Sequence, residues 1–346
     1  MPSIVDVAKR AGVSVTTVSR VINDNPHRVN PETRKRILQA AEELNFKPSS
    51  LARALVSDQS CIIGVVVGDI TDPYFSTIVR GISDVALEHG YLPMTCNSDR
   101  VPDLELHYVQ MLRNYHVDGI IFAGGGLTDT SYLEEMQGLL MSRRKRAIPI
   151  VTLGRHLFNA PQVNIDNTGA AREITDYLIG LGHQRIGFIA GPSVLTTSAL
   201  RLEGYKQSLE VHGIPYNPEL VIESDFTYES GFQIGECLLQ LKPSPTAVLG
   251  SNDMTAIGCL TFLNTRGIKV PGEISVAGFD DIAATQYTNP PLSTIHVPMR
   301  DLGITGMKQL LRLIESEESV ETMYILPHSL VIRASCAAPS DVVPSL

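Results

Sequence analysis

The stretch GVSVTTVSRVIN, residues 12–23, predicts a tight turn followed by a short helix with two unlike faces. Gly12 can adopt the left-handed conformation that ends a preceding helix, and Ser14 can cap the next one. Apolar residues recur at helical spacing and are predicted to pack inward: Val15, Val18 and Ile22. The outward face carries short hydrogen-bonding side chains and one arginine: Thr16, Thr17, Ser19, Arg20 and Asn23.

Such an outward face matches the major groove of DNA. A guanidinium can donate two hydrogen bonds to guanine there, and hydroxyl groups can reach bases or phosphates. A single amphipathic helix is more often only a surface helix of a small bundle. Two flanking segments favour the first interpretation, because helices are also expected from Ser3 to Gly12 and from Pro31 onward. Together they predict an all-α helix-turn-helix head.

The charge distribution agrees with a head that contacts phosphate. The whole chain of 346 residues has a formal net charge of −9. Residues 1–60 contain nine Lys and Arg against six Asp and Glu, a charge of +3, which leaves −12 for the remainder. A basic head on an acidic body is expected when only the head binds nucleic acid.

From residue 61 onward, apolar strand-like runs alternate with amphipathic helices, as in an α/β fold of parallel sheets flanked by helices. The predicted strands form two sets, which indicate two similar lobes: 62–69, 92–99, 117–125 and 148–154, then 185–192, 220–225, 246–253 and 275–281. Ligands of such folds bind where the carboxyl ends of the strands meet.

Polar and aromatic residues follow these strand ends, as expected for a cleft that holds a sugar or a flat base. Taken singly, a strand-end Asp or Asn is more often a helix cap, and a Phe is more often part of the core. Their recurrence predicts a joint binding site made of Asp72, Tyr74, Phe75, Arg155, Thr197, Arg201, Phe226, Asn252 and Asp280.

The segment SSLARALVSDQS, residues 49–60, is too short to form a stable helix alone. It is either a flexible linker or a hinge helix that folds on DNA. An exposed leucine in a basic linker can act as a minor-groove wedge that unstacks a base step.

The segments DVAKRAGVSVTTVSRVIN and TRKRILQAAEELNFKPSSLARAL closely resemble the head and hinge of the lactose-repressor (LacI/GalR) family of bacterial transcription factors. The resemblance implies that Val15, Thr16 and Arg20 read bases, and that Leu55 beside Ala52 inserts at the operator centre. The residues that position the helix would be Ser14, Thr17, Ser19 and Asn23.

The resemblance continues to about residue 340 and implies a two-lobed core like that of periplasmic sugar-binding proteins. It assigns the cleft to an effector, with Arg201 and Asp280 above all. It implies that the lining residues are Tyr74, Phe75, Arg155, Arg201, Phe226, Asn252 and Asp280. Gly154 departs from several members, which carry an acid before the residue at Arg155. The expected domains are a head (1–47), a hinge (48–60) and a core (61–340), with one lobe at about 61–162 and 292–324 and the other at about 163–291 and 325–340.

We therefore predict a homodimeric repressor of a near-palindromic operator, controlled by a small molecule, most simply a sugar. The C-terminal segment lacks leucine heptads, so a dimer is expected rather than a tetramer. Alternatives are a sugar-binding protein of transport, or a regulator that responds to a purine or a phosphorylated carrier protein. With no signal peptide or membrane-spanning run apparent, we expect a cytoplasmic protein.

An enzyme is not expected, because no nucleophile or paired-carboxylate set can be argued from spacing. The glycines at 124–126 are followed by Asp129, which breaks the dinucleotide-binding pattern. The five cysteines lack the spacing of a metal or redox site, and we expect neither metal nor cofactor.

Overall fold

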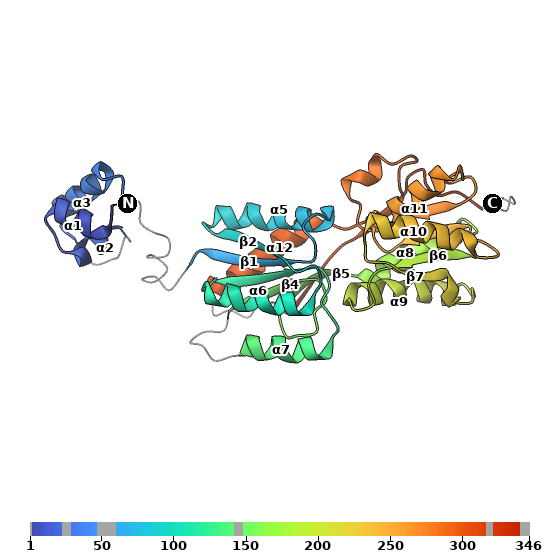
Figure 1. Ribbon diagram of the computed structural model, residues 1–346, viewed down its shortest axis with the longest axis horizontal. Helices are drawn as coiled ribbons and strands as arrows, with labels where there is room; N and C mark the ends of the chain where they lie inside the picture. The colour runs from blue at the N-terminus through green and yellow to red at the C-terminus, as the bar shows by residue number, and fades with distance from the viewer. Residues whose placement is uncertain (1, 23–28, 47–59, 142–147, 316–320, 340–346) are drawn as a thin grey trace. The chain divides into compact units, whose positions relative to one another are not determined.

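The computed structural model describes residues 2–22, 29–46, 60–141, 148–315 and 321–339. The predictions for Asn23, Ala52 and Leu55 lie outside these residues. The chain divides into two compact units, a head that ends at Cys61 and takes in residues 116–118, and a body that holds the rest. Figure 1 labels the helices and strands of each unit.

The head is a bundle of three helices, α1 (Ile4–Ala11), α2 (Val15–Ile22) and α3 (Pro31–Glu43). The predicted capping box is present, because the backbone amide of Ser3 donates to Asp6 at 2.8 Å and the Asp6 amide donates to Ser3 Oγ. Gly12 ends α1 in the left-handed conformation, with φ of 66°. The Thr17 amide donates to Ser14 Oγ at 3.1 Å, so Ser14 caps α2.

The head core differs from the prediction within α2. Val18 is fully buried as expected, but Val15 is 41 % exposed and Val21 is buried in its place. Ile22 is only partly buried. The inward stripe of α2 is therefore Val18 and Val21, one turn apart, while Val15 in the first turn lies outside the contact with the other helices.

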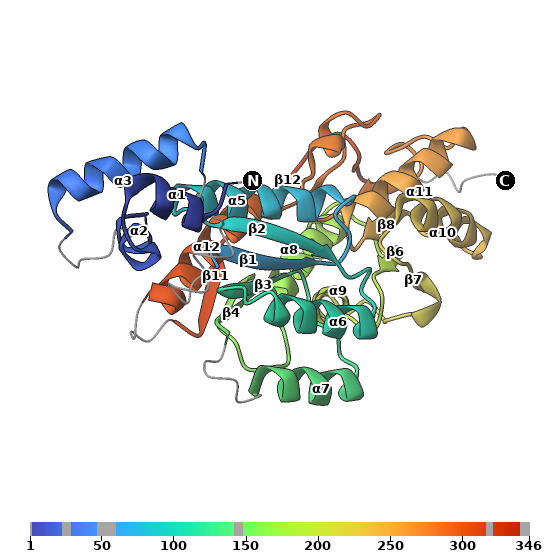
Figure 2. The ribbon, with the colours of Figure 1, turned by 60° about the vertical axis from the view of Figure 1, so that its left-hand side comes forward.

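The first half of the body, here called the N-lobe, is built on a six-stranded parallel sheet in the order β11-β5-β4-β3-β1-β2. Its strands are β1 (Ile62–Val67), β2 (Leu92–Asn97), β3 (Gly119–Ala123), β4 (Ile150–Leu153), β5 (Gln162–Ile165) and β11 (Met323–Leu326). Its helices are α5 (Pro73–Glu88), α6 (Pro102–Asn114), α7 (Thr130–Met141) and α12 (Met299–Glu315). Helices α5 and α6 cover opposite faces of the sheet (Figures 1 and 2).

The second half, here called the C-lobe, repeats this design around a four-stranded parallel sheet in the order β7-β6-β8-β9. Its strands are β6 (Ile186–Ala190), β7 (Val221–Glu223), β8 (Ala247–Gly250) and β9 (Ser275–Ala277). Its helices are α8 (Asn167–Gly180), α9 (Thr196–Val211), α10 (Tyr228–Gln240) and α11 (Asp253–Thr265), with the 3-10 turns η1 (Pro218–Leu220) and η2 (Ala283–Gln286). Helix α8 packs beside α9, and α10 packs beside α11.

The chain passes between the lobes after β5, before α12 and after β11. Two of these crossings carry β10 (Thr294–His296) and β12 (Ser329–Val331), which pair as an antiparallel ribbon. The strands predicted from apolar runs are present, but β5, β10, β11 and β12 were not predicted as strands. Within the described part of the chain, no helix is both long and apolar enough to span a bilayer.

Candidate functional site

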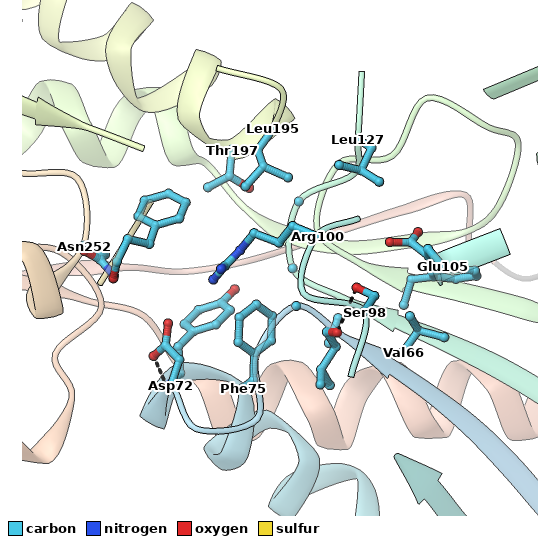
Figure 3. Close-up of a pocket in the computed structure, with 18 of the residues that line it drawn as sticks. Val66, Asp72, Phe75, Ser98, Arg100, Glu105, Leu127, Leu195, Thr197 and Asn252 are labelled. Atoms are coloured by element: carbon cyan, nitrogen blue, oxygen red, sulfur yellow. Dashed lines mark hydrogen bonds between the residues drawn. The ribbon is translucent and has the colours of Figure 1, made fainter. Parts of the chain in front are cut away.

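A pocket lies between the carboxyl ends of the two sheets and is lined by side chains from both lobes (Figure 3). It encloses about 670 Å³ of space, part of which is open to solvent. The N-lobe supplies the side chains of Val66, Val67, Asp72, Tyr74, Phe75, Ser98, Arg100, Glu105, Phe122, Leu127 and His156. The C-lobe supplies Leu195, Thr197, Arg201, Phe226, Asn252 and Asp280.

Eight of the nine residues predicted for the cleft line this pocket: Asp72, Tyr74, Phe75, Thr197, Arg201, Phe226, Asn252 and Asp280. The exception is Arg155, whose side chain is exposed and does not reach the lining. Its backbone carbonyl instead accepts from the Gly126 amide at 2.9 Å and from Thr196 Oγ1 at 2.6 Å. Gly154 has a φ of 147°, and His156, two residues further on, is buried and lines the pocket.

Arg201 is the most extensively bonded side chain of the pocket. It comes from α9, and its guanidinium donates to Asp280 Oδ1 at 3.2 Å, to Asn167 Oδ1 at 3.0 Å and to the Ser251 carbonyl. Its planar group also stacks 3.7 Å above the ring of Phe279. These contacts fix the guanidinium in one orientation at the floor of the C-lobe side.

The two carboxyl groups of the predicted set lie in unlike surroundings. Burial raises the pKa of Asp280 well above its ordinary range, and the charge of Arg201 acts against this. Burial also raises the pKa of Asp72, although its carboxylate accepts the Tyr74 amide at 2.9 Å and caps α5. The oxygens of either carboxyl group can accept hydrogen bonds from a ligand.

Asn252 and Phe226 combine a structural role with a place in the lining. Asn252 Oδ1 accepts the Thr255 amide at 3.0 Å and caps α11, while its Nδ2 donates to the Phe226 carbonyl at 3.0 Å. Phe226 has a φ of 71°, a conformation that non-glycine residues rarely adopt. The hydrogen bond from the Asn252 side chain to the Phe226 carbonyl helps to hold this backbone conformation. It thereby helps to keep the Phe226 ring in the pocket.

Sequence reasoning missed several lining residues, chiefly Arg100, Glu105 and His156. The guanidinium of Arg100 lies 5.7 Å from the ring centre of Phe75 and 5.6 Å from that of Phe226. Nothing in the sequence distinguished it from a solvated turn residue. Glu105 lies within α6, and His156 lies beside Arg155. Neither spacing nor composition marked these two residues as part of a binding site.

Glu105 is a buried carboxyl at the N-lobe end of the pocket, across Arg100 from Asn252 (Figure 3). Tyr132 Oη donates a short hydrogen bond to it. Burial raises the pKa of Glu105 to about 7. His156 is buried nearby, and burial lowers its pKa to about 4, so its ring is neutral.

The lobes also touch directly at one edge of the pocket. The Thr196 amide donates to the Gly126 carbonyl at 3.0 Å, and Leu127 pairs with Leu195 as an isolated antiparallel bridge. Gly125 permits this approach, because a Cβ there would lie 2.1 Å from Thr197 Oγ1. The pocket therefore has a closed edge that is made of backbone from both lobes.

The outward face of α2 in the head carries the predicted DNA-reading residues that the structure describes. Ser14, Val15, Thr16 and Arg20 are exposed, and Thr17 and Ser19 are half-buried. The hydroxyl groups of Ser14 and Thr17 lie 2.8 Å apart and bond to each other. The remaining predicted contacts, Asn23, Ala52 and Leu55, fall outside the described residues.

Comparison with known proteins agrees with this two-part organisation. Residues 3–49 match the family described as bacterial regulatory proteins, lacI family, and residues 175–336 match a periplasmic binding protein-like domain. Catabolite control protein A of Priestia megaterium is 34 % identical over 336 residues, which cover 96 % of this chain and 98 % of the relative.

Solved structures also resemble this chain, both in fold and in sequence. A lac repressor dimer bound to operator and the anti-inducer ONPF has a TM-score of 0.84 at 30 % identity, covering 97 % of this chain and 99 % of its own. A LacI family regulator from Enterococcus faecium with bound ribose has a TM-score of 0.69 at 30 % identity, covering 81 % and 100 %. The chain belongs to the lacI family of bacterial regulatory proteins.

Proposed function

We propose that this protein is a homodimeric transcriptional repressor whose affinity for operator DNA is set by a small molecule bound between the N-lobe and the C-lobe. The observation that carries the proposal is the convergence of eight predicted residues on one pocket, in a chain whose head exposes a helix suited to the major groove. The relatives are transcriptional regulators, which supports a regulatory rather than an enzymatic role.

In the head, α2 is the recognition helix. Arg20 is exposed and can donate two hydrogen bonds to a guanine, and Thr16 can reach a neighbouring base. Val15 can contact the methyl group of a thymine, because its side chain is exposed on α2. Two heads of a dimer would read the two halves of a near-palindrome, as the operator-bound lac repressor dimer suggests by analogy.

The effector is proposed to be a small polar molecule with a face that stacks on aromatic rings, and a sugar is the first candidate. Phe75 and Phe226 offer rings from opposite lobes, while Asp280 and Arg201 offer polar groups at the C-lobe floor. The ribose bound to the Enterococcus faecium regulator supports this class of ligand.

Switching follows from the position of the ligand between two bodies. A molecule that contacts Asp72 in one lobe and Asp280 in the other changes the relative free energy of the arrangements that the lobes can take. The hinge, residues 48–60, would transmit the change by folding, with Leu55 as minor-groove wedge, only when two chains are correctly spaced. A regulator that acts on chromosomal DNA in this way works in the cytoplasm.

A ligand screen on the full-length chain tests the effector part. Thermal unfolding is followed with sugars, sugar phosphates, nucleosides and purines, and a ligand at 100 times its Kd should add about 2.7 kcal/mol to the stability. The shift should vanish in Arg201→Ala and persist in Arg172→Ala, because Arg172 is an exposed helix residue outside the pocket lining. If no compound shifts the parent protein, the small-molecule proposal fails and a protein co-repressor becomes the better candidate.

A further inference from the structure

Arg100 stands in the middle of the pocket, although it belongs to the turn between β2 and α6. Its φ of 60° is a left-handed conformation. This conformation costs an L-residue free energy, which the surrounding structure must offset. The side chain extends from this turn into the pocket, toward the side where Asp72 and Asn252 lie (Figure 3). The backbone conformation is thus tied to a guanidinium that faces the ligand space.

The neighbouring strand end leaves room for this side chain. A Cβ at Gly68 would lie 3.2 Å from Arg100 Nε and 3.0 Å from Phe75 Cζ. Any larger residue at position 68 would therefore displace the arginine, the phenylalanine or both. Phe75 of the N-lobe and Phe226 of the C-lobe flank the guanidinium within 6 Å, which leaves its in-plane N–H groups as the available donors.

Those donors make no hydrogen bond or ion pair with any of the described residues. The contrast with Arg201 is direct, since three of the five N–H groups of that guanidinium donate to Asp280, Asn167 and a backbone carbonyl. A half-buried guanidinium with five donors and no acceptor has unused capacity for planar, two-pronged recognition of an oxyanion.

The acids around Arg100 do not use this capacity. Asp280 is paired with Arg201, and Glu105 bonds to Tyr132 at the far end of the pocket. Asp72 is the acid whose charge acts on Arg100, but its Oδ1 is bonded to the Tyr74 amide.

We infer that Arg100 is the specificity-determining residue of the pocket and that it selects an effector carrying a negatively charged group, a phosphate or a carboxylate, next to its stacking face. The inference rests on the proposed function, because it assumes that an effector binds here. Charge-assisted hydrogen bonds from a guanidinium to an oxyanion are about twice as strong as those to a neutral hydroxyl. Phe75 and Phe226 would keep the arginine in place for this contact.

The test is calorimetric titration of the full-length chain with matched pairs of ligands. The pairs are glucose and glucose 6-phosphate, ribose and ribose 5-phosphate, adenosine and AMP, and glucose and glucuronate, with inorganic phosphate alone as a further probe. In at least one pair the anionic member should bind about tenfold tighter or more, and its affinity should fall with added salt. A response confined to the phosphates or to glucuronate identifies which anion the pocket takes.

Variants assign the effect to the residue. Arg100→Met keeps the apolar stem, and it should weaken the anionic ligand by about 30-fold or more while changing the neutral partner by less than about threefold. Arg100→Lys should retain part of the preference, because it keeps the charge but loses the planar fork. Arg172→Met removes an exposed arginine elsewhere and should bind as the parent does.

Two results would overturn the inference. One is equal or tighter binding of the neutral members, lost in Arg201→Ala but unchanged in Arg100→Met, which would leave the proposed function intact. The other is the absence of binding by every anionic member. If neutral ligands fail as well, the proposed effector site fails together with the inference.

Discussion

Arg201 Nη2 lies 3.2 Å from Asp280 Oδ1, and both side chains are almost completely buried, at 5 % and 6 % exposed. The pair joins α9 to the loop that follows β9, and its two residues are 79 positions apart in the chain. Since an ion pair removed from water is favourable only when its remaining donors are satisfied, the bonds of Arg201 to Asn167 and Ser251 are part of the same arrangement.

Removing one partner of this pair should destabilise the body. In Arg201→Ala, Asp280 would be left as a buried carboxylate without a cation, at a cost of about 3–5 kcal/mol in the free energy of unfolding. Urea unfolding measures this loss. The double variant Arg201→Ala with Asp280→Asn should recover part of it, because no uncompensated charge remains. A single variant as stable as the parent would show that the pair has little effect.

The raised pKa of Glu105 gives the stability a defined pH dependence. Burial shifts the pKa from an ordinary 4.5 to about 7, so the folded protein holds this proton more tightly than the unfolded chain does. The contribution is therefore fully present below pH 4.5 and is lost as the pH rises toward 7, by about 3 kcal/mol.

Glu105→Gln should remove that dependence while keeping an acceptor for the hydroxyl of Tyr132. The measurement is the free energy of unfolding of both proteins between pH 4.5 and pH 7. The difference between parent and variant should change steadily across this interval. Parallel curves would mean that Glu105 titrates alike in the folded and unfolded chains.

Gly12→Ala isolates the cost of the left-handed turn in the head. A Cβ at Gly12 would meet no atom within 4 Å, so the φ of 66° is the only source of strain. Amide hydrogen exchange measures this cost. The opening free energy of the backbone amides in α1 and α2 should fall by about 1 kcal/mol.

Gly138→Ala provides the matched control for that substitution. Gly138 lies inside α7, also with no atom within 4 Å of an added Cβ, but without a positive φ. The same change should there raise the opening free energy of α7 amides by about 0.5–1 kcal/mol. Destabilisation at both sites would argue against the backbone explanation.

Two substitutions in the head, one in α2 and one in α3, should affect DNA binding in different ways. Arg20→Met should cost about 1–3 kcal/mol in discrimination between the preferred sequence and one with an altered guanine. Lys35→Met, on the solvated side of α3, should weaken binding to all duplexes alike and lower the salt dependence if it contacts phosphate. Competition binding with the selected and altered duplexes distinguishes them, and unchanged discrimination in Arg20→Met would contradict the assignment.

Much of the fold could be predicted because local signals and burial agree. The capping box at Ser3 and the left-handed Gly12 are set by residues a few positions apart, and the apolar run of β1 can only be a strand buried on both faces. The crossing strands β10 and β12 were missed, because neither lies in a long apolar run and each pairs with a partner far away in the chain.

The pocket was predictable where a residue directly follows a strand, as Asp280 does, and not where long-range geometry decides. Arg100 enters the pocket through a positive φ in a polar turn, and polar turns are usually solvated. Arg155 and His156 show the same limit, because their sequence does not reveal which of these two adjacent side chains faces inward. Val15 was assigned to the inward stripe because it lies three positions before Val18, but the buried residues of α2 are Val18 and Val21.

The most direct test of the account is the affinity of the full-length chain for its selected duplex, measured with and without the ligand found by thermal unfolding. Saturating ligand should change the operator affinity of the parent protein by about 5- to 150-fold. Arg201→Ala should bind the duplex but no longer respond to the ligand. An operator affinity that does not change when the pocket is occupied would contradict the central claim.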